Sequence, residues 1–162
     1  KSDEGGPAHG RILLPYAPAV NAAVHPPTDL LIVGAGPVGL ACALEASRAG
    51  LTHVVLEKGS LLNTLVNWPV HVVFFSTPEL LEIGGHPFVS AGPKPTRREG
   101  LDYYRKVAER ERLDVRLGAP VLSLKKADGV FVAATPKGTA MASTTSARMW
   151  AGVMVLPARH RR

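Results

Sequence analysis

Three glycines, Gly34, Gly36 and Gly39, form a Gly-x-Gly-x-x-Gly pattern in residues 32–42. Gly34 would allow a tight turn, Gly36 would let the backbone approach a pyrophosphate, and Gly39 would let a helix pack closely on a strand. Pro37 and Val38 lie between Gly36 and Gly39, just before a predicted helix whose free N–H groups attract phosphate. The pattern predicts a dinucleotide-binding turn, with these five residues at the ligand.

A carboxylate at Glu57 follows the glycines within the expected distance of roughly 20 residues. It ends a second predicted strand, where it could accept hydrogen bonds from both hydroxyls of an adenosine ribose. The same negative charge disfavours the 2′-phosphate of NADP. NAD and FAD both remain open on these residues alone.

The elements that must position these residues follow from the hydrophobic pattern. Residues 30–33 are uniformly apolar, as expected of a strand buried on both faces of a parallel sheet. Helices are predicted over residues 40–49 and 97–112, and strands over 53–57, 115–117, 120–125, 129–135, 139–142 and 151–156. The predicted fold class is α/β: a Rossmann-like domain with a parallel sheet and a small antiparallel β-meander, in three ββα layers.

The composition of the chain argues against a membrane-spanning, a disulfide-bonded and a nucleic-acid-binding protein. The 162 residues are 46% hydrophobic and 20% charged, as in a globular protein, and no apolar run has the roughly 18 to 20 residues that span a bilayer. One cysteine excludes an internal disulfide, so a cytoplasmic location is expected. The net charge of +6 owes much to arginines near the C-terminus, and nucleic-acid binding is therefore not expected. No metal-ligand spacing occurs among the histidines.

The chain divides into three predicted parts. Residues 1–28 are rich in Gly, Pro and Ala and are expected to be a disordered leader. Residues 29–156 would form the nucleotide-binding domain, and residues 157–162 a basic tail.

Several longer blocks resemble one flavoprotein family. They are residues 29–40 around the glycine pattern, Val55-Leu-Glu-Lys-Gly, Asn67-Trp-Pro-Val-His-Val-Val-Phe-Phe-Ser-Thr, Leu81-Glu-Ile-Gly-Gly-His-Pro-Phe and residues 94–105. The family is YpdA, the bacillithiol-disulfide reductases related to thioredoxin reductase. The resemblance runs from about residue 29 to 126, and the block from 67 to 88 is its most specific part.

The resemblance implies FAD at the glycine pattern, with Glu57 on the ribose and Lys58 beside it. His71 and residues 74–77 would lie towards the flavin ring, and Val121 would offer backbone groups to the adenine. The alternative for Phe74 and Phe75 is packing in the core. The alternative for His71 is a structural role. Members of the family transfer hydride from NADPH to FAD and on to a small-molecule disulfide. Whether the protein forms a homo-oligomer is left open.

The chain departs from the family in two places. Relatives often carry a cysteine just before the third glycine, where this sequence has Val38; Cys42 lies inside the predicted helix and is expected to be a small buried residue. Relatives also continue with an NADPH-binding domain and a return segment, which these residues do not contain, so the domain is expected to be incomplete. A truncated or frame-shifted reading would explain this. A flavin-dependent monooxygenase and a nucleotide-binding fragment without catalysis are the alternative functions.

Overall fold

A computed structural model describes residues 28–127, 130–136, 138–143, 148–150 and 153–156. Nearly all of the predicted leader and the whole of the predicted tail lie outside the described residues, and the three-part division of the chain stays a prediction. The helices are α1 Pro37–Arg48, α2 Asn63–Val66, α3 Pro78–Leu81 and α4 Arg97–Arg110. The strands are β1 Leu30–Val33, β2 His53–Leu56, β3 Val115–Arg116, β4 Ser123–Ala127, β5 Val130–Thr135, β6 Gly138–Ser143, β7 Arg148–Trp150 and β8 Val153–Leu156.

The central sheet has the strand order β3-β2-β1-β8-β7. Strands β1, β2 and β3 are parallel, with Leu30 opposite His53 and Val55 opposite Val115. This confirms the predicted parallel sheet with β1 inside it. Strand β8 pairs with β1 in the antiparallel sense, and so does β7 with β8. Strand β7 was not predicted, and only two residues separate it from β8, a link too short for a parallel pair.

A second sheet of three strands, in the order β4-β5-β6, is antiparallel throughout. This is the predicted meander. Its first strand begins at Ser123, three residues later than predicted from Pro120. Pro120 has no backbone N–H to donate to a ladder, and it lies instead in the connection that leads from β3 to the meander.

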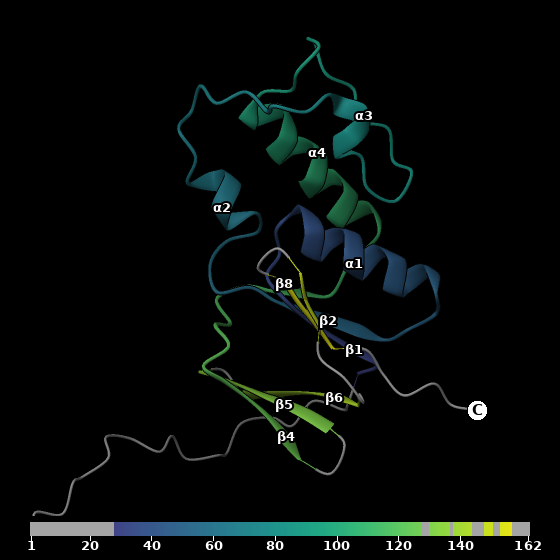
Figure 1. The fold of residues 1–162 in the computed structure, drawn as a ribbon, viewed down its shortest axis with the longest axis vertical. Helices are drawn as coiled ribbons and strands as arrows, with labels where there is room; N and C mark the ends of the chain where they lie inside the picture. The colour runs from purple at the N-terminus through teal and green to yellow at the C-terminus, as the bar shows by residue number, and fades with distance from the viewer. Residues whose placement is uncertain (1–27, 128–129, 137, 144–147, 151–152, 157–162) are drawn as a thin grey trace, which may run out of the picture.

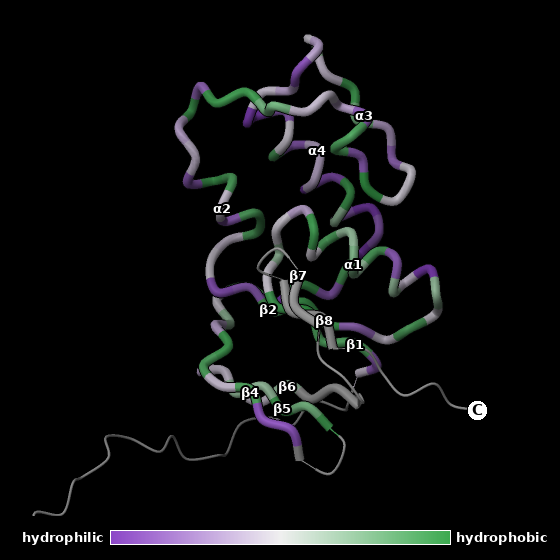
Figure 2. Tube along the Cα trace, viewed as in Figure 1, coloured by the Kyte–Doolittle hydropathy of each residue, from purple (hydrophilic) through white to green (hydrophobic). Residues whose placement is uncertain are grey.

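Figure 1 shows the three layers: α1 and α4 cover one face of the central sheet, and the β4–β6 sheet covers the other. Strand β1 is buried on both sides, because Ile32 belongs to the cluster on the helix side and Leu31 to the cluster between the sheets. Both side chains are fully buried. The predicted three-layer ββα arrangement is confirmed, and β1 and α1 carry the hydrophobic residues that Figure 2 shows along them.

Helix α1 starts at Pro37, three residues before the predicted start, because proline is well suited to the first turn of a helix.

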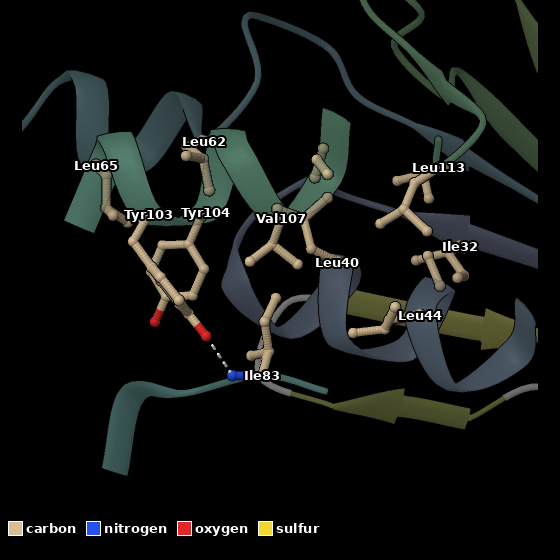
Figure 3. Close-up of a cluster of buried hydrophobic side chains, with 14 of the residues drawn as sticks. Ile32, Leu40, Leu44, Leu62, Leu65, Ile83, Tyr103, Tyr104, Val107 and Leu113 are labelled. Atoms are coloured by element: carbon tan, nitrogen blue, oxygen red, sulfur yellow. Dashed lines mark hydrogen bonds between the residues drawn. The ribbon is translucent and has the colours of Figure 1, made fainter. Parts of the chain in front are cut away.

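Helix α4 presents Tyr104 and Val107 to the core, next to Leu40 and Leu44 of α1 (Figure 3). The hydroxyl of Tyr103 accepts a hydrogen bond of 2.8 Å from the backbone N–H of Ile83, which ties the loop after α3 to this core.

Candidate cofactor-binding site

The glycine loop between β1 and α1 has the geometry that its sequence predicts. Gly34 has a φ of 105°, a conformation that favours glycine. A Cβ on Gly39 would lie 1.9 Å from the carbonyl oxygen of Gly34, so helix and loop meet without room for a side chain. A Cβ on Gly36 would have no atom within 4 Å. The open space at Gly36 is the side from which a ligand could approach the backbone.

The residue between the first two glycines is braced from two directions. The N–H of Ala35 donates to Oε2 of Glu57 at 2.8 Å, and its carbonyl accepts from the N–H of Leu62 at 3.0 Å. The N–H of Gly34 donates to the carbonyl of Leu56 at 2.8 Å. The loop is therefore held by strand β2 on one side and by the start of α2 on the other.

Glu57 is a buried carboxylate directly after β2, with 6% of its surface exposed. Its Oε1 accepts from the N–H of Gly59 at 2.9 Å, in addition to the bond from Ala35 to Oε2. The backbone of Glu57 is fixed as well, because its carbonyl accepts from the N–H of Ala119 at 2.8 Å. Each carboxylate oxygen has two lone-pair directions, so each can accept one further hydrogen bond from a ligand hydroxyl.

A cavity of ≈ 410 Å³ opens at the carboxyl ends of β1 and β2. Ligands bind at this edge in open α/β sheets. The lining residues are Val33, Gly34, Gly36, Leu56, Glu57, Lys58, Asn63, Thr64, Ala119, Pro120 and Val121. Five of the predicted site residues, Gly34, Gly36, Glu57, Lys58 and Val121, therefore meet in one cavity, although the cofactor contacts themselves remain a prediction.

The other predicted residues lie elsewhere. Gly39 is buried beneath the loop, while Pro37 and Val38 line a different cavity together with Cys42. His71 is exposed and is not among the lining residues of the cavity at Glu57. Burial raises the pKa of the Cys42 thiol, which lowers the thiolate fraction at neutral pH.

The aromatic pair after His71 has two separate environments. Phe74 is buried, and its ring lies 5.3 Å from that of Trp68, centroid to centroid, so core packing accounts for it. Phe75 is 96% exposed and, with Val73, borders an apolar cavity of ≈ 420 Å³.

Sequence reasoning missed Asn63, Thr64, Ala119 and Pro120 as lining residues. Asn63 and Thr64 belong to the turn-rich middle of the chain, where prolines interrupt any regular pattern. The one available signal was position: these residues follow the acid-bearing strand closely and are polar. Pro120 is predicted to begin a strand and Ala119 belongs to no predicted element, and the late start of β4 leaves both at the cavity.

Within the described residues, no group of three or more His, Cys, Asp or Glu side chains is arranged to hold a metal ion. In the same part of the chain, no helix has the length and apolarity required to cross a bilayer.

The profile of the pyridine nucleotide-disulphide oxidoreductase family matches residues 31–152, which is most of the chain. The chain belongs to this family. Among curated members, the bacilliredoxin reductase Bdr of Bacillus subtilis is 42% identical over 81 residues, which are 50% of this chain and 25% of Bdr. A ferredoxin–NADP reductase of Streptococcus agalactiae is 32% identical over 111 residues, covering 67% of this chain and 30% of the relative.

Solved structures agree with the resemblance to YpdA. The bacillithiol disulfide reductase Bdr (YpdA) from Staphylococcus aureus superimposes with a TM-score of 0.68 and 35% identity, over 72% of this chain and 38% of that one. A flavin monooxygenase from Stenotrophomonas maltophilia reaches the same TM-score at 24% identity, which shows a shared fold alone. The chain thus spans well under half the length of the relatives that it matches.

Proposed function

We propose that this chain is the FAD-binding portion of an NAD(P)H-dependent flavoprotein oxidoreductase of the bacillithiol-disulfide reductase type. The observation that carries the proposal is the single cavity at the carboxyl ends of β1 and β2, where Gly34, Gly36 and Glu57 come together. The family membership and the 35% identity to the S. aureus reductase support the flavin assignment over NAD. The monooxygenase alternative rests on a shared fold only.

The cavity fits the adenosine and phosphate part of FAD. The space beside Gly36 would admit a pyrophosphate, and the remaining lone pairs of Glu57 match the two hydroxyls of a ribose. The exposed Lys58 would lie beside Glu57 at the ribose, and the backbone at Val121 would meet the adenine. When bound, FAD would supply hydride and electron transfer. The protein itself would hold the adenosine and phosphate end of FAD in a fixed position.

The substrate of the whole oxidoreductase would be a small-molecule disulfide reduced with NADPH, in a reducing cytoplasmic compartment. Bacillithiol disulfide is the substrate class that the names of the relatives suggest. These steps need parts of the protein beyond the cavity described here, and His71 and residues 74–77 keep their predicted place near the flavin ring as part of the proposal.

The proposal is tested by calorimetric titration of the purified chain with FAD, NAD and NADP, together with an absorbance scan for co-purified flavin. FAD should bind most tightly, and NADP should bind most weakly because Glu57 repels a 2′-phosphate. Equal affinity for all three dinucleotides, or none for FAD, would refute the assignment.

Gly36→Val is the matching variant. Gly36 has a φ of −80°, which any residue adopts, and its Cβ would meet open space, so the variant should fold normally while its side chain blocks the pyrophosphate. Gly92→Val, in an exposed loop remote from the cavity, is the control and should bind FAD like the parent.

A further inference from the structure

We infer that Asn63 is a further binding residue of the cavity at Glu57, and that its carboxamide donates a hydrogen bond to a phosphate oxygen of the dinucleotide. The inference rests on the function proposed above and adds a residue that neither the glycine pattern nor the resemblance indicated. Three observations carry it: the backbone that brings Asn63 to the cavity, the state of its amide, and the room that Gly59 leaves for it.

The backbone that delivers Asn63 is unusual. Leu62, directly before it, has left-handed angles of φ 59° and ψ 35° and is fully buried. Such a conformation is a genuine outlier for a bulky residue and persists only where the surroundings fix it. Here the N–H of Leu62 donates to the carbonyl of Ala35 in the glycine loop. The sharp turn therefore sets the first residue of α2 beside that loop.

The other end of α2 is anchored by a long-range contact. Nε of Arg97, at the start of α4, donates to the carbonyl of Leu65 at 2.8 Å, and the same guanidinium donates to the carbonyl of Val66. The short helix is thus tied to the glycine loop at one end and to α4 at the other. Asn63 is held on this frame rather than on a free loop.

The amide of Asn63 is only half used. Its Oδ1 accepts from Oγ of Ser60 at 3.3 Å. Its Nδ2 has no hydrogen-bond partner among the described residues, although Asn63 is half-buried and lines the cavity. The side chain therefore offers two unused N–H donors at the cavity wall.

Gly59 leaves the room that the Asn63 side chain occupies. A Cβ at position 59 would lie 2.6 Å from Oδ1 of Asn63 and 2.7 Å from its Cγ. The backbone of Gly59 is not in the left-handed region, so its conformation alone does not require glycine. The glycine is explained by the amide that lies against it.

The chemistry of the cavity divides into an accepting and a donating side. Glu57 can only accept hydrogen bonds when ionised, so it suits ribose hydroxyls, whereas amide N–H groups and the cation of Lys58 suit oxygens that can only accept. Phosphate oxygens are such groups, and they would lie near Gly36 if the glycine loop binds them. Asn63 completes the donating side.

The test compares ADP with adenosine, which lacks the phosphates. Parent, Asn63→Ala and Asn63→Asp chains are titrated calorimetrically with each compound, and circular dichroism checks their folding. Asn63→Ala should weaken ADP binding about tenfold, the size expected of a hydrogen bond to a charged group, and leave adenosine affinity within about twofold. Asn63→Asp has the same shape but repels phosphate, so it should weaken ADP binding further. Ser47→Asp, exposed on α1 away from the cavity, controls for the added charge and should leave both affinities unchanged.

A second variant acts on Asn63 indirectly. In Gly59→Ala the new methyl group should push the flexible amide aside at little cost to stability, and ADP affinity should fall as in Asn63→Ala. In the Asn63→Ala background the same change should have no further effect, a coupling that a purely structural role for Gly59 would not produce.

The outcomes separate the inference from the proposed function. Unchanged ADP affinity in Asn63→Asp, or equal losses for ADP and adenosine, would overturn the phosphate contact while leaving FAD binding intact. A parent chain that binds neither FAD nor ADP would overturn the proposed function and the inference with it.

Discussion

Glu57 braces the glycine loop, and in the proposed function the same carboxylate also binds the ribose. Its two oxygens hold the N–H groups of Ala35 and Gly59, so the carboxylate shapes the glycine loop before any ligand arrives. The sequence predicted Glu57 and the glycines because acid, glycine spacing and strand end all follow from residue type. It could not predict Asn63, because Asn63 is brought to the cavity by a left-handed turn at Leu62. Leucine rarely adopts that conformation, so its presence in the sequence does not indicate such a turn.

Replacing Glu57 should therefore have two effects. Glu57→Ala leaves the buried N–H of Ala35 without its partner, which should cost about 1 to 3 kcal/mol in the free energy of unfolding. It also removes the proposed ribose contacts, worth roughly ten- to a hundredfold in FAD affinity. Urea denaturation and calorimetric titration measure the two effects separately.

The control is Glu45→Ala, which removes an exposed carboxylate paired with Arg48 on the surface of α1. It should change the free energy of unfolding by less than about 1 kcal/mol and leave FAD affinity unchanged. If Glu57→Ala bound FAD as tightly as the parent, Glu57 would not be the ribose ligand.

At the scale of elements, helices and parallel strands were predictable because periodicity and apolar runs reveal them. The direction of β8 could not be predicted, because an apolar run has the same pattern in a parallel and in an antiparallel strand. The neighbouring strand β7 is short and carries no clear pattern. The contact between loop and helix was predictable from Gly39, where the structure shows backbone against backbone.

Gly39→Ala should consequently disrupt the packing of α1 against β1. The added Cβ would lie 1.9 Å from the carbonyl oxygen of Gly34, and a backbone atom cannot move aside as a flexible side chain can. We expect a loss of about 1 to 3 kcal/mol or more in the free energy of unfolding, measured by urea denaturation. Gly36→Ala, in the same loop with open space around its Cβ, should be close to neutral; equal losses in the two variants would contradict this packing argument.

Helix α4 begins with a capping box in which Thr96 and Glu99 exchange hydrogen bonds. Hydrogen bonds from the backbone N–H of Ala91, then from Thr96 and Ser90, lower the pKa of Glu99 from 4.5 to about 2. A carboxyl whose pKa is lower in the folded state stabilises the fold above pH 4.5, and this contribution disappears as the pH falls towards about 2.

Glu99→Gln should thus lower stability at neutral pH and flatten the loss of stability between pH 4.5 and about 2. An amide can accept through only one of its two terminal atoms, so it cannot replace both sets of bonds. Thermal midpoints measured across this pH range test the prediction. Glu109→Gln, exposed on the same helix, should keep the pH dependence of the parent.

At the scale of the whole molecule, the cavity at the glycine loop is the proposed nucleotide site, and the 162 residues contain one Gly-x-Gly-x-x-Gly pattern. Hydride transfer requires a nicotinamide held within about 3 to 3.5 Å of the flavin, and such positioning supplies much of the rate. The family resemblance assigns that task to a second nucleotide domain.

We therefore expect this chain, mixed with FAD, NADPH and a low-molecular-weight disulfide, to consume NADPH no faster than free flavin does. The absorbance of NADPH follows the reaction, and a full-length reductase of the same family is run in parallel. A rate that matches the full-length reductase would show that a partner chain supplies the second domain or that it is dispensable.

The exposed apolar side chains at the cavity beside Phe75 affect how the chain behaves in concentrated solution. Phe75 and Val73, which border the apolar cavity in the loop between α2 and α3, are 96% and 45% exposed. Exposed apolar patches of this kind drive self-association, and the net charge of +6 opposes it by mutual repulsion between molecules. Salt shortens the range of that repulsion to roughly 10 Å at 0.1 M, so the colloidal stability of the chain should be highest in dilute buffer and decline as salt is added.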